Sequence, residues 1–295
     1  MCSSDLKSKS FNFASDVNDP LSSPIYGFAE SNNGEIYAGG YSGVFKFNEI
    51  SAEFDTLIEE QTLTEIYEGE HTSVRRLMMD SNQNLWIGTV TSLLQYSNSQ
   101  LKSVSLYENG EVLKSDWSIH TILEGYDGNI WIGTEGNGLI KLAPDWNRYN
   151  IYISANKEPI DIRRAYQFQD SIWIAHPSSK MESFQFTNGN LKLLNSLQPD
   201  LGSGSIRIDS IYQDHPDYLW ISSIQGIHKV DSKTGESQMI ENTEGKKLGS
   251  VRNLYKTNDR FYFQLFSEEK LAYFDESNRQ AHIIKNEAEH QHKGT

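Results

Sequence analysis

The sequence predicts an all-β protein: a six-bladed β-propeller in which each blade is a sheet of four antiparallel strands. Aromatic residues make up 12% of the 295 residues, a content that suits pleated, half-buried strand surfaces. One strand–turn–strand pattern recurs six times at intervals of about 45 residues, which is typical of propeller blades. Each copy carries an aromatic residue at the same position, namely Tyr37, Trp86, Trp131, Trp173, Trp220 and Tyr262.

Within each copy the expected elements follow one order, which is clearest in the third copy. An apolar pair three residues apart, Ile119 and Ile122, marks the first strand. An Asp-Gly-Asn turn at 127–129 leads into the second strand, which holds Trp131. A loop of small residues then precedes a third strand with alternating apolar positions, Leu139–Leu142. The six copies begin at Ile25, Val74, Ile119, Ile162, Ile208 and Val251.

A fourth, less regular strand follows each third strand and completes the expected blade. These fourth strands are predicted at 53–58, 101–106, 148–153, 191–194, 236–240 and 280–284. The blades then span residues near 22–58, 73–106, 118–153, 160–196, 206–240 and 250–284. One such sheet cannot bury both of its faces alone, so we expect the blades to stack around an axis. A β-sandwich or an open solenoid is disfavoured, because those folds lack an aromatic residue at a fixed position.

The two ends of the sequence are expected to lie outside the propeller, which we predict as one domain over residues 7–284. Residues 1–6 resemble a translated sequencing adapter and are interpreted as a non-native leader; in the alternative, a lipoprotein, Cys2 is the lipidated residue. Residues 285–295 are polar and unpatterned, as in a tail. Residues 7–14 fit an outer strand. Two interpretations of this strand stay open: it closes a six-bladed ring, or the chain is a fragment of a seven-bladed or tandem parent propeller.

Composition and missing motifs narrow the function. The chain has 26 Lys and Arg against 40 Asp and Glu, for a net charge of −14, so its average surface repels nucleic acid. No apolar run approaches the roughly 18 residues that a membrane helix requires, so a membrane would enter only through parent segments outside this sequence. No P-loop, dinucleotide or HExxH motif is present. We therefore expect no catalytic residues, no cofactor and no metal.

The third copy, residues 119–142, resembles the two-component regulator propeller repeat. It has Asp127-Gly128 in the turn and the Trp-Ile-Gly-Thr stretch Trp131–Thr134 in the second strand. Residues 74–96 resemble the repeat as well, although Ser92 stands where the pattern has Gly. The other four copies keep the spacing of the repeat better than its residue identities.

This resemblance covers about residues 22–284 and implies a role. The family occurs in periplasmic sensor regions of bacterial hybrid histidine kinases and of some diguanylate cyclases. It implies a periplasmic or extracellular, non-catalytic sensor that recognises oligosaccharides or another polar or anionic small ligand. It also implies a signal passed by rearrangement of a homodimer. Because function belongs to sites and partners, the resemblance is more specific for the fold than for the role.

The first set of candidate ligand-binding residues follows the first apolar residue of each innermost strand, at the face where propellers present ligands. This position reads Tyr26, Arg75, His120, Arg163, Asp209 and Arg252 around the expected ring. Two of these residues precede a second arginine, Arg76 or Arg164. Guanidinium groups gathered on an acidic protein would attract a carboxylate or sulfate. In the alternative interpretation, the arginines only bridge neighbouring blades and acidic loops.

The second set lies in the loops between second and third strands, because loops on a rigid scaffold often carry recognition. The candidates there are Tyr41, Asn137, His176 and Gln225. The Asp80–Asn84 turn is compared with a calcium loop but is interpreted as a β-turn. The repeated tryptophans are interpreted as packing between blades rather than as sugar platforms.

Two other functional classes stay open. A propeller lyase or glycoside hydrolase would need an acid/base pair within a few ångströms at the mouth of the ring. A protein–protein scaffold would instead show a large apolar patch on a blade edge.

Overall fold

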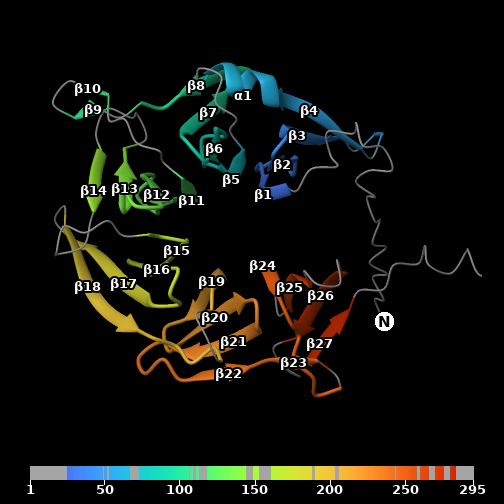
Figure 1. Cartoon of the computed structure of the whole chain (residues 1–295), viewed down its shortest axis with the longest axis vertical. Helices are drawn as coiled ribbons and strands as arrows, with labels where there is room; N and C mark the ends of the chain where they lie inside the picture. Colours follow the sequence, from blue (N-terminus) through green and yellow to red (C-terminus); the bar gives the residue numbers. More distant parts are fainter. Residues whose placement is uncertain are drawn as a thin grey trace, which may run out of the picture. The chain divides into compact units, whose positions relative to one another are not determined.

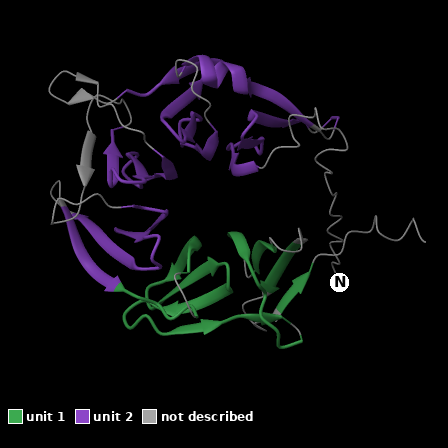
Figure 2. Cartoon of the chain, in the orientation of Figure 1, with its two compact units in different colours: residues 1–13, 197–295 green, residues 14–196 purple. Residues whose placement is uncertain are grey.

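The computed structural model divides the chain into two compact units (Figures 1 and 2). Unit 1 comprises residues 1–13 and 197–295, and unit 2 comprises residues 14–196. The structure describes residues 25–48, 50–51, 53–66, 73–105, 107–108, 111–112, 118–143, 149–152, 161–187, 190–202, 206–242, 244–257, 260–265, 270–275 and 280–283. The expected leader, the expected outer strand at 7–14 and the expected tail lie outside these residues.

Unit 2 holds four sheets of four antiparallel strands, each in sequence order from inner to outer strand. The first sheet is β1 (Ile25–Glu30), β2 (Ile36–Gly40), β3 (Gly43–Asn48) and β4 (Glu53–Glu59). The second is β5 (Val74–Met79), β6 (Leu85–Thr89), β7 (Leu93–Ser97) and β8 (Gln100–Ser103). The third is β11 (Ile119–Glu124), β12 (Ile130–Thr134), β13 (Leu139–Leu142) and β14 (Tyr149–Tyr152). The fourth is β15 (Arg164–Phe168), β16 (Ser171–Ala175), β17 (Met181–Thr187) and β18 (Asn190–Leu197), whose last residue falls in unit 1.

Unit 1 holds the other two sheets. The fifth sheet is β19 (Ile208–His215), β20 (Tyr218–Ser223), β21 (Gly226–Asp231) and β22 (Ser237–Met239). The sixth is β24 (Val251–Thr257), β25 (Arg260–Leu265), β26 (Lys270–Asp275) and β27 (Gln280–Ile283). A short strand, β23 (Glu241–Asn242), adds to the outer edge of the sixth sheet by pairing in parallel with β27. The fold is therefore all-β, a six-bladed β-propeller with four-stranded antiparallel blades, as the repeat predicted.

Three short elements lie outside the repeat. Helix α1 (Glu60–Ile66) follows β4 and buries Leu63. The strands β9 (Tyr107–Glu108) and β10 (Glu111–Val112) form a small antiparallel hairpin. Among the described residues, no helix is long and apolar enough to cross a membrane.

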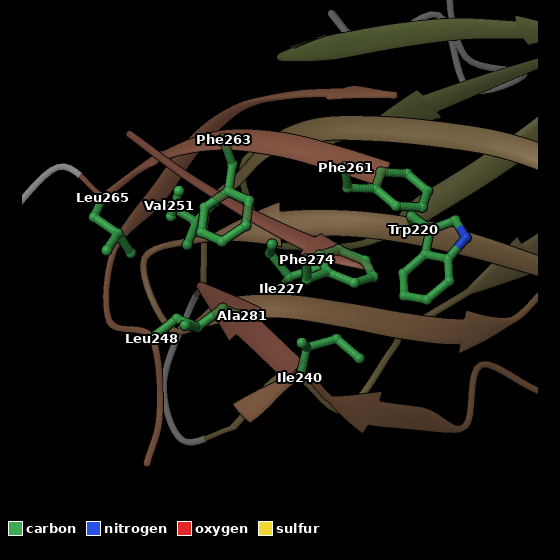
Figure 3. Close-up of a cluster of buried hydrophobic side chains, with 11 residues drawn as sticks. Trp220, Ile227, Ile240, Leu248, Val251, Phe261, Phe263, Leu265, Phe274 and Ala281 are labelled. Carbon is green, nitrogen blue, oxygen red and sulfur yellow. The ribbon is translucent and has the colours of Figure 1, made fainter. Parts of the chain in front are cut away.

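The repeated aromatic residue lies in the second strand of each blade and is buried in the first five blades, whereas Tyr262 of the sixth is partly exposed. All four tryptophans of the repeat are buried: Trp86, Trp131, Trp173 and Trp220. They pack with apolar side chains of their own sheet and of adjacent sheets, as Trp86 does with Ile119 and Ile122 of the next blade. In unit 1, Figure 3 shows Trp220 beside Phe261 and Phe274, with ring centroids 4.8 and 5.1 Å away. The packing interpretation of the tryptophans is thus confirmed.

The glycine of the repeated Gly-Thr pair makes room for the next blade. A Cβ added to Gly88 would lie 2.6 Å from Ile119 Cγ2, and one added to Gly133 would lie 2.7 Å from Ile162 Cγ2. Both contacts are closer than packed carbon atoms allow. The glycine therefore lets the first apolar residue of the following blade approach the second strand closely.

Gly88→Ala is expected to lower the free energy of unfolding by about 2 kcal/mol, because overpacking a tight interface forces side chains and backbone to shift. Chemical denaturation followed by tryptophan fluorescence measures this change. Gly136→Ala is a useful comparison, since a Cβ there meets nothing within 4 Å and only the φ of +84° opposes it. Equal unfolding midpoints for Gly88→Ala and the parent protein would contradict the packing role.

Candidate functional site

The residue that follows the first apolar residue of the inner strand is a β-bulge in most blades. In β1, β5, β11 and β19 the pairing register shifts at this point, so one residue has no partner across the ladder: Tyr26, Arg75, His120 and Asp209. In the fourth blade, Arg163 donates its backbone N–H to the carbonyl of Ala175, the residue that pairs with Arg164. A bulge bends the strand and re-aims its side chain, and bulges often adjoin functional sites.

Four of these residues belong to unit 2, and we call Tyr26, Arg75, His120 and Arg163 the inner row. Their strands β1, β5, β11 and β15 lie in sequence around the inner side of unit 2 (Figure 1). Two pairs of the row are in contact. The Arg75 guanidinium lies 5.1 Å from the centre of the Tyr26 ring, and Arg163 Nη1 lies 3.2 Å from His120 Nε2.

The second arginine of each Arg-Arg pair holds the backbone of neighbouring blades. Arg76 donates from Nε to the carbonyl of His120 at 2.6 Å and from Nη1 to the carbonyl of Tyr26 at 2.9 Å. Arg164 donates from Nη1 to the carbonyl of Arg163 at 2.6 Å and to that of His120 at 3.4 Å. The expectation that arginines bridge blades therefore describes Arg76 and Arg164.

The first arginines are placed differently. The Nε atoms of Arg75 and Arg163 are buried and have no hydrogen-bond partner within the described part of the chain. A guanidinium offers five donors, and a buried donor without a partner is unfavourable. These two Nε–H groups are therefore donors of the inner row that the described residues leave unsatisfied.

An aromatic pair adjoins Arg75. Tyr26 packs edge to face against Tyr41, with ring centroids 5.4 Å apart. Tyr41 lies in the turn between β2 and β3 and is 36% exposed. One candidate from the loop set thus joins the inner row, and the two rings place an apolar surface beside a cation.

His120 is the centre of a polar cluster. Its Nε2 lies 2.8 Å from Glu135 Oε2 and 3.4 Å from Ser118 Oγ, in addition to Arg163 Nη1. Burial lowers the pKa of His120, and the positive charge of Arg163 acts in the same direction, although the hydrogen bond to Glu135 opposes both. The hydrogen bond from His120 lowers the pKa of Glu135, and Arg163 adds to that effect. At neutral pH the cluster therefore holds a neutral imidazole, a carboxylate and a guanidinium.

The remaining residues of the first set lie in unit 1 and have other surroundings. Asp209 is buried and forms an ion pair with Arg207, whose Nε lies 3.0 Å from Asp209 Oδ1. Arg252 stays in register opposite Gln264, and the bulge of β24 comes after it.

The other loop candidates are described by their own surroundings. His176 Nε2 lies 2.9 Å from Glu182 Oε2, and Lys180 Nζ lies 2.6 Å from the other oxygen of that carboxylate. Burial raises the pKa of Glu182, but the hydrogen bonds from Lys180 and His176 outweigh it, so the pKa is lowered. Asn137 sits between two glycines with positive φ. Gln225 lies in the turn between β20 and β21, where its N–H donates to Ser223 Oγ.

Sequence reasoning missed the charged partners at these sites. Glu135 falls within a loop that was expected to be functional, directly after the Gly-Thr pair, but nothing distinguished it from other exposed acids. Glu182 is two residues after Lys180, and Arg207 is two residues before Asp209, a spacing that places both members of a pair on one side of an extended chain. This spacing of two residues is the sequence signal that could have identified the two ion pairs.

No group of three or more His, Cys, Asp or Glu residues suited to a metal occurs in the described residues. The Asp80 turn shows why its sequence resembles a calcium loop. The Asp80 carboxylate accepts hydrogen bonds from the backbone of Asn82 and Asn84 and from the indole Nε1 of Trp86. It is a turn built around one carboxylate, as interpreted from the sequence.

The fold places the chain in the class of β-propellers, and two of its repeats also match a known family of propeller repeats. Residues 69–91 and 113–136 match the sequence model of the two component regulator propeller family. The chain therefore carries repeats of that family, which confirms the resemblance seen in the second and third copies. No curated protein sequence matches the chain.

Several solved structures share the fold at low identity. The extracellular domain of a putative hybrid two component system from B. thetaiotaomicron aligns with a TM-score of 0.62 and 12% identity, over 88% of this chain and 34% of that chain. A catalytically inactive virginiamycin B lyase from Staphylococcus aureus aligns with a TM-score of 0.66 and 14% identity, over 90% and 85% of the two chains. A gluconolactonase from Xanthomonas campestris gives 0.55 and 14%, over 82% and 83%. At these identities the likeness shows the fold alone.

Proposed function

We propose that this chain is the non-catalytic, ligand-sensing propeller of a two-component-type regulator and that its inner row binds an oligosaccharide or another polar, anionic small ligand. The observation that carries the proposal is the unequal use of the two arginines in each pair. Arg76 and Arg164 hold backbone carbonyls, whereas Arg75 and Arg163 keep a buried Nε–H without a partner among the residues that the structure describes. A buried donor without a partner calls for a physical explanation, and a bound group that accepts from it is one such explanation.

The net charge of the chain and the aromatic rings beside Arg75 support this function. A net charge of −14 makes a local concentration of guanidinium groups an attractive point for an anion. Tyr26 and Tyr41 add aromatic surface beside Arg75, a combination suited to a ligand with both polar and apolar faces.

The proposed setting is periplasmic or extracellular. It is supported by the family repeats and by the extracellular two-component domain among the proteins of the same fold. Passage of the signal, through a homodimer and through parent segments that cross a membrane, would lie outside this chain.

The test is calorimetric titration with defined oligosaccharides from cellulose, xylan, homogalacturonan and alginate. For the oligosaccharide that binds, the double variant Arg75→Ala/Arg163→Ala is expected to weaken binding at least about tenfold, since a charge-assisted hydrogen bond contributes about 1.5–3 kcal/mol. The control is Lys102→Ala/Lys192→Ala, which removes the same charge from exposed positions on the outer strands β8 and β18. Unchanged affinity in the arginine variant would exclude the inner row as the site.

An enzymatic function is the second candidate, because His120 of the inner row contacts the carboxylate of Glu135, a combination suited to general acid/base chemistry. His120 and Glu135 are 2.8 Å apart, and lyase and lactonase propellers share the fold. This function predicts that the protein shortens or eliminates one of the same oligosaccharides, and that His120→Ala abolishes the reaction. Chromatography of the oligosaccharides after long incubation decides between binding and turnover.

A further inference from the structure

The Arg163 guanidinium is incompletely paired. Its Nη1 approaches His120 Nε2 at 3.2 Å, while its Nε is buried without a partner in the part of the chain that the structure describes. The neighbouring Arg164 uses its own guanidinium on the carbonyls of Arg163 and His120. The Nε edge of Arg163 is therefore a donor that the described residues do not use.

The contacts at His120 Nε2 cannot all be satisfied at once. Burial lowers the pKa of His120, so near pH 7 the neutral ring carries a proton on one nitrogen. If that proton is on Nε2, the imidazole donates to Glu135 and cannot accept from Arg163. If the proton is on Nδ1, Arg163 donates to Nε2, and Glu135 loses the hydrogen bond from His120. One of the two charged neighbours of His120 is left without its hydrogen bond in either case.

An oxyanion on Arg163 removes this conflict. Two oxygens of a carboxylate or sulfate can accept from Nε and an adjacent Nη of one guanidinium, the paired geometry that arginine favours. Arg163 then no longer needs His120 as an acceptor. The Nε2 proton of His120 is free to donate to Glu135, and every charged group of the cluster has a partner.

We propose that Arg163 is an oxyanion-binding site, preorganised by the His120–Glu135 pair, and that the ligand of this propeller carries a carboxylate or sulfate group that binds there. The inference rests on the proposed ligand-binding function and specifies the chemical class of the ligand. Glu135 has a second effect, because its carboxylate, 48% exposed, repels an incoming anion and partly neutralises Arg163. It therefore sets the strength of the site.

The test follows the Nε–H signals of ¹⁵N-labelled arginine in the full chain during titration with sodium sulfate, with sodium chloride at equal ionic strength as the reference. The Arg163 signal, assigned by its loss in Arg163→Lys, is expected to shift and saturate in the millimolar range. The Nε–H of Arg76 serves as the internal control, since it already donates to the His120 carbonyl. A flat Arg163 signal, or equal shifts in Arg76 and Arg163, would overturn the proposal.

Glu135→Gln provides a second measurement. The amide keeps an oxygen that can accept from His120 but removes the negative charge, so sulfate is expected to bind several-fold more tightly. Unchanged or weaker sulfate binding in this variant would contradict the role given to Glu135.

Oligosaccharides separate this inference from the proposed function. Tetragalacturonate supplies carboxylates, a κ-carrageenan tetrasaccharide supplies sulfates without carboxylates, and cellotetraose supplies neither. A shift of the Arg163 signal with either acidic saccharide supports the oxyanion site and indicates the source of the anion. Saturable binding of cellotetraose that leaves the Arg163 signal unmoved would retain the sensor function and exclude the oxyanion site.

Discussion

Asp80→Ala is expected to lower the free energy of unfolding by about 3 kcal/mol, because it leaves several buried donors without an acceptor. Asp80 is 5% exposed. Its carboxylate accepts from Trp86 Nε1 at 2.8 Å, from the backbone of Asn84 at 2.7 Å and from the backbone of Asn82 at 3.0 Å. Chemical denaturation followed by tryptophan fluorescence measures the loss.

Asp127→Ala in the third blade is the matched control. Asp127 is 47% exposed and pairs at 2.7 Å with Nζ of Lys141, whose side chain is 8% exposed; Asp127→Ala is expected to cost less than Asp80→Ala, because water reaches the Asp127 side of this pair. The combination of Asp80→Ala with Trp86→Phe isolates the indole hydrogen bond, which should appear as a coupling energy of about 1 kcal/mol. Equal losses of stability for Asp80→Ala and Asp127→Ala would contradict the role of Asp80 as the shared acceptor of these buried donors.

The same turn shows why the fold could be predicted from the sequence. Its order of residues repeats because the backbone repeats. Ser31, Asp80 and Gly125 each donate a backbone N–H to a carbonyl four residues later. The fourth residue of each turn has a positive φ, which Gly34, Gln83 and Gly128 adopt. Short range order of this kind, combined with a buried aromatic residue in each second strand, leaves few folds to choose from.

Elements without a counterpart in the other blades were not predictable in this way. Helix α1, the β9–β10 hairpin and strand β23 occur once each. Strand β23 joins the sixth sheet by pairing with β27, about forty residues away in the chain. Tertiary contacts of that range leave no local pattern in the sequence.

The site was predictable in position but not in detail. The sequence showed that arginine follows the first apolar residue in several blades, but it could not show which arginine of a pair donates to backbone carbonyls. The bulge decides this, since Arg75 lies outside the pairing register while Arg76 pairs with Gly88. The shift depends on hydrogen bonds between two strands, and the residue types at 75 and 76 are identical.

Acidification is expected to destabilise unit 1 through His228. This residue is 2% exposed on β21, and neither ring nitrogen has a hydrogen-bond partner among the described residues. Burial lowers the pKa of His228 from 6.5 to about 4, with a smaller contribution from Lys247, which Asp200 opposes. Above pH 6.5 the ring is neutral in both folded and unfolded chains, so the stabilisation is complete there.

Between pH 6.5 and 4 the unfolded chain binds a proton at His228 that the folded chain does not. The free energy of unfolding therefore decreases as the pH is lowered through this range. A difference of this size corresponds to about 3 kcal/mol across the window. His228→Leu keeps a side chain of similar volume and removes the titrating group. The measurement is the unfolding free energy of parent and variant at several pH values, with Trp220 as the tryptophan of unit 1. The variant should keep its stability where the parent loses it, and parallel curves for the two proteins would show that His228 does not control the acid response.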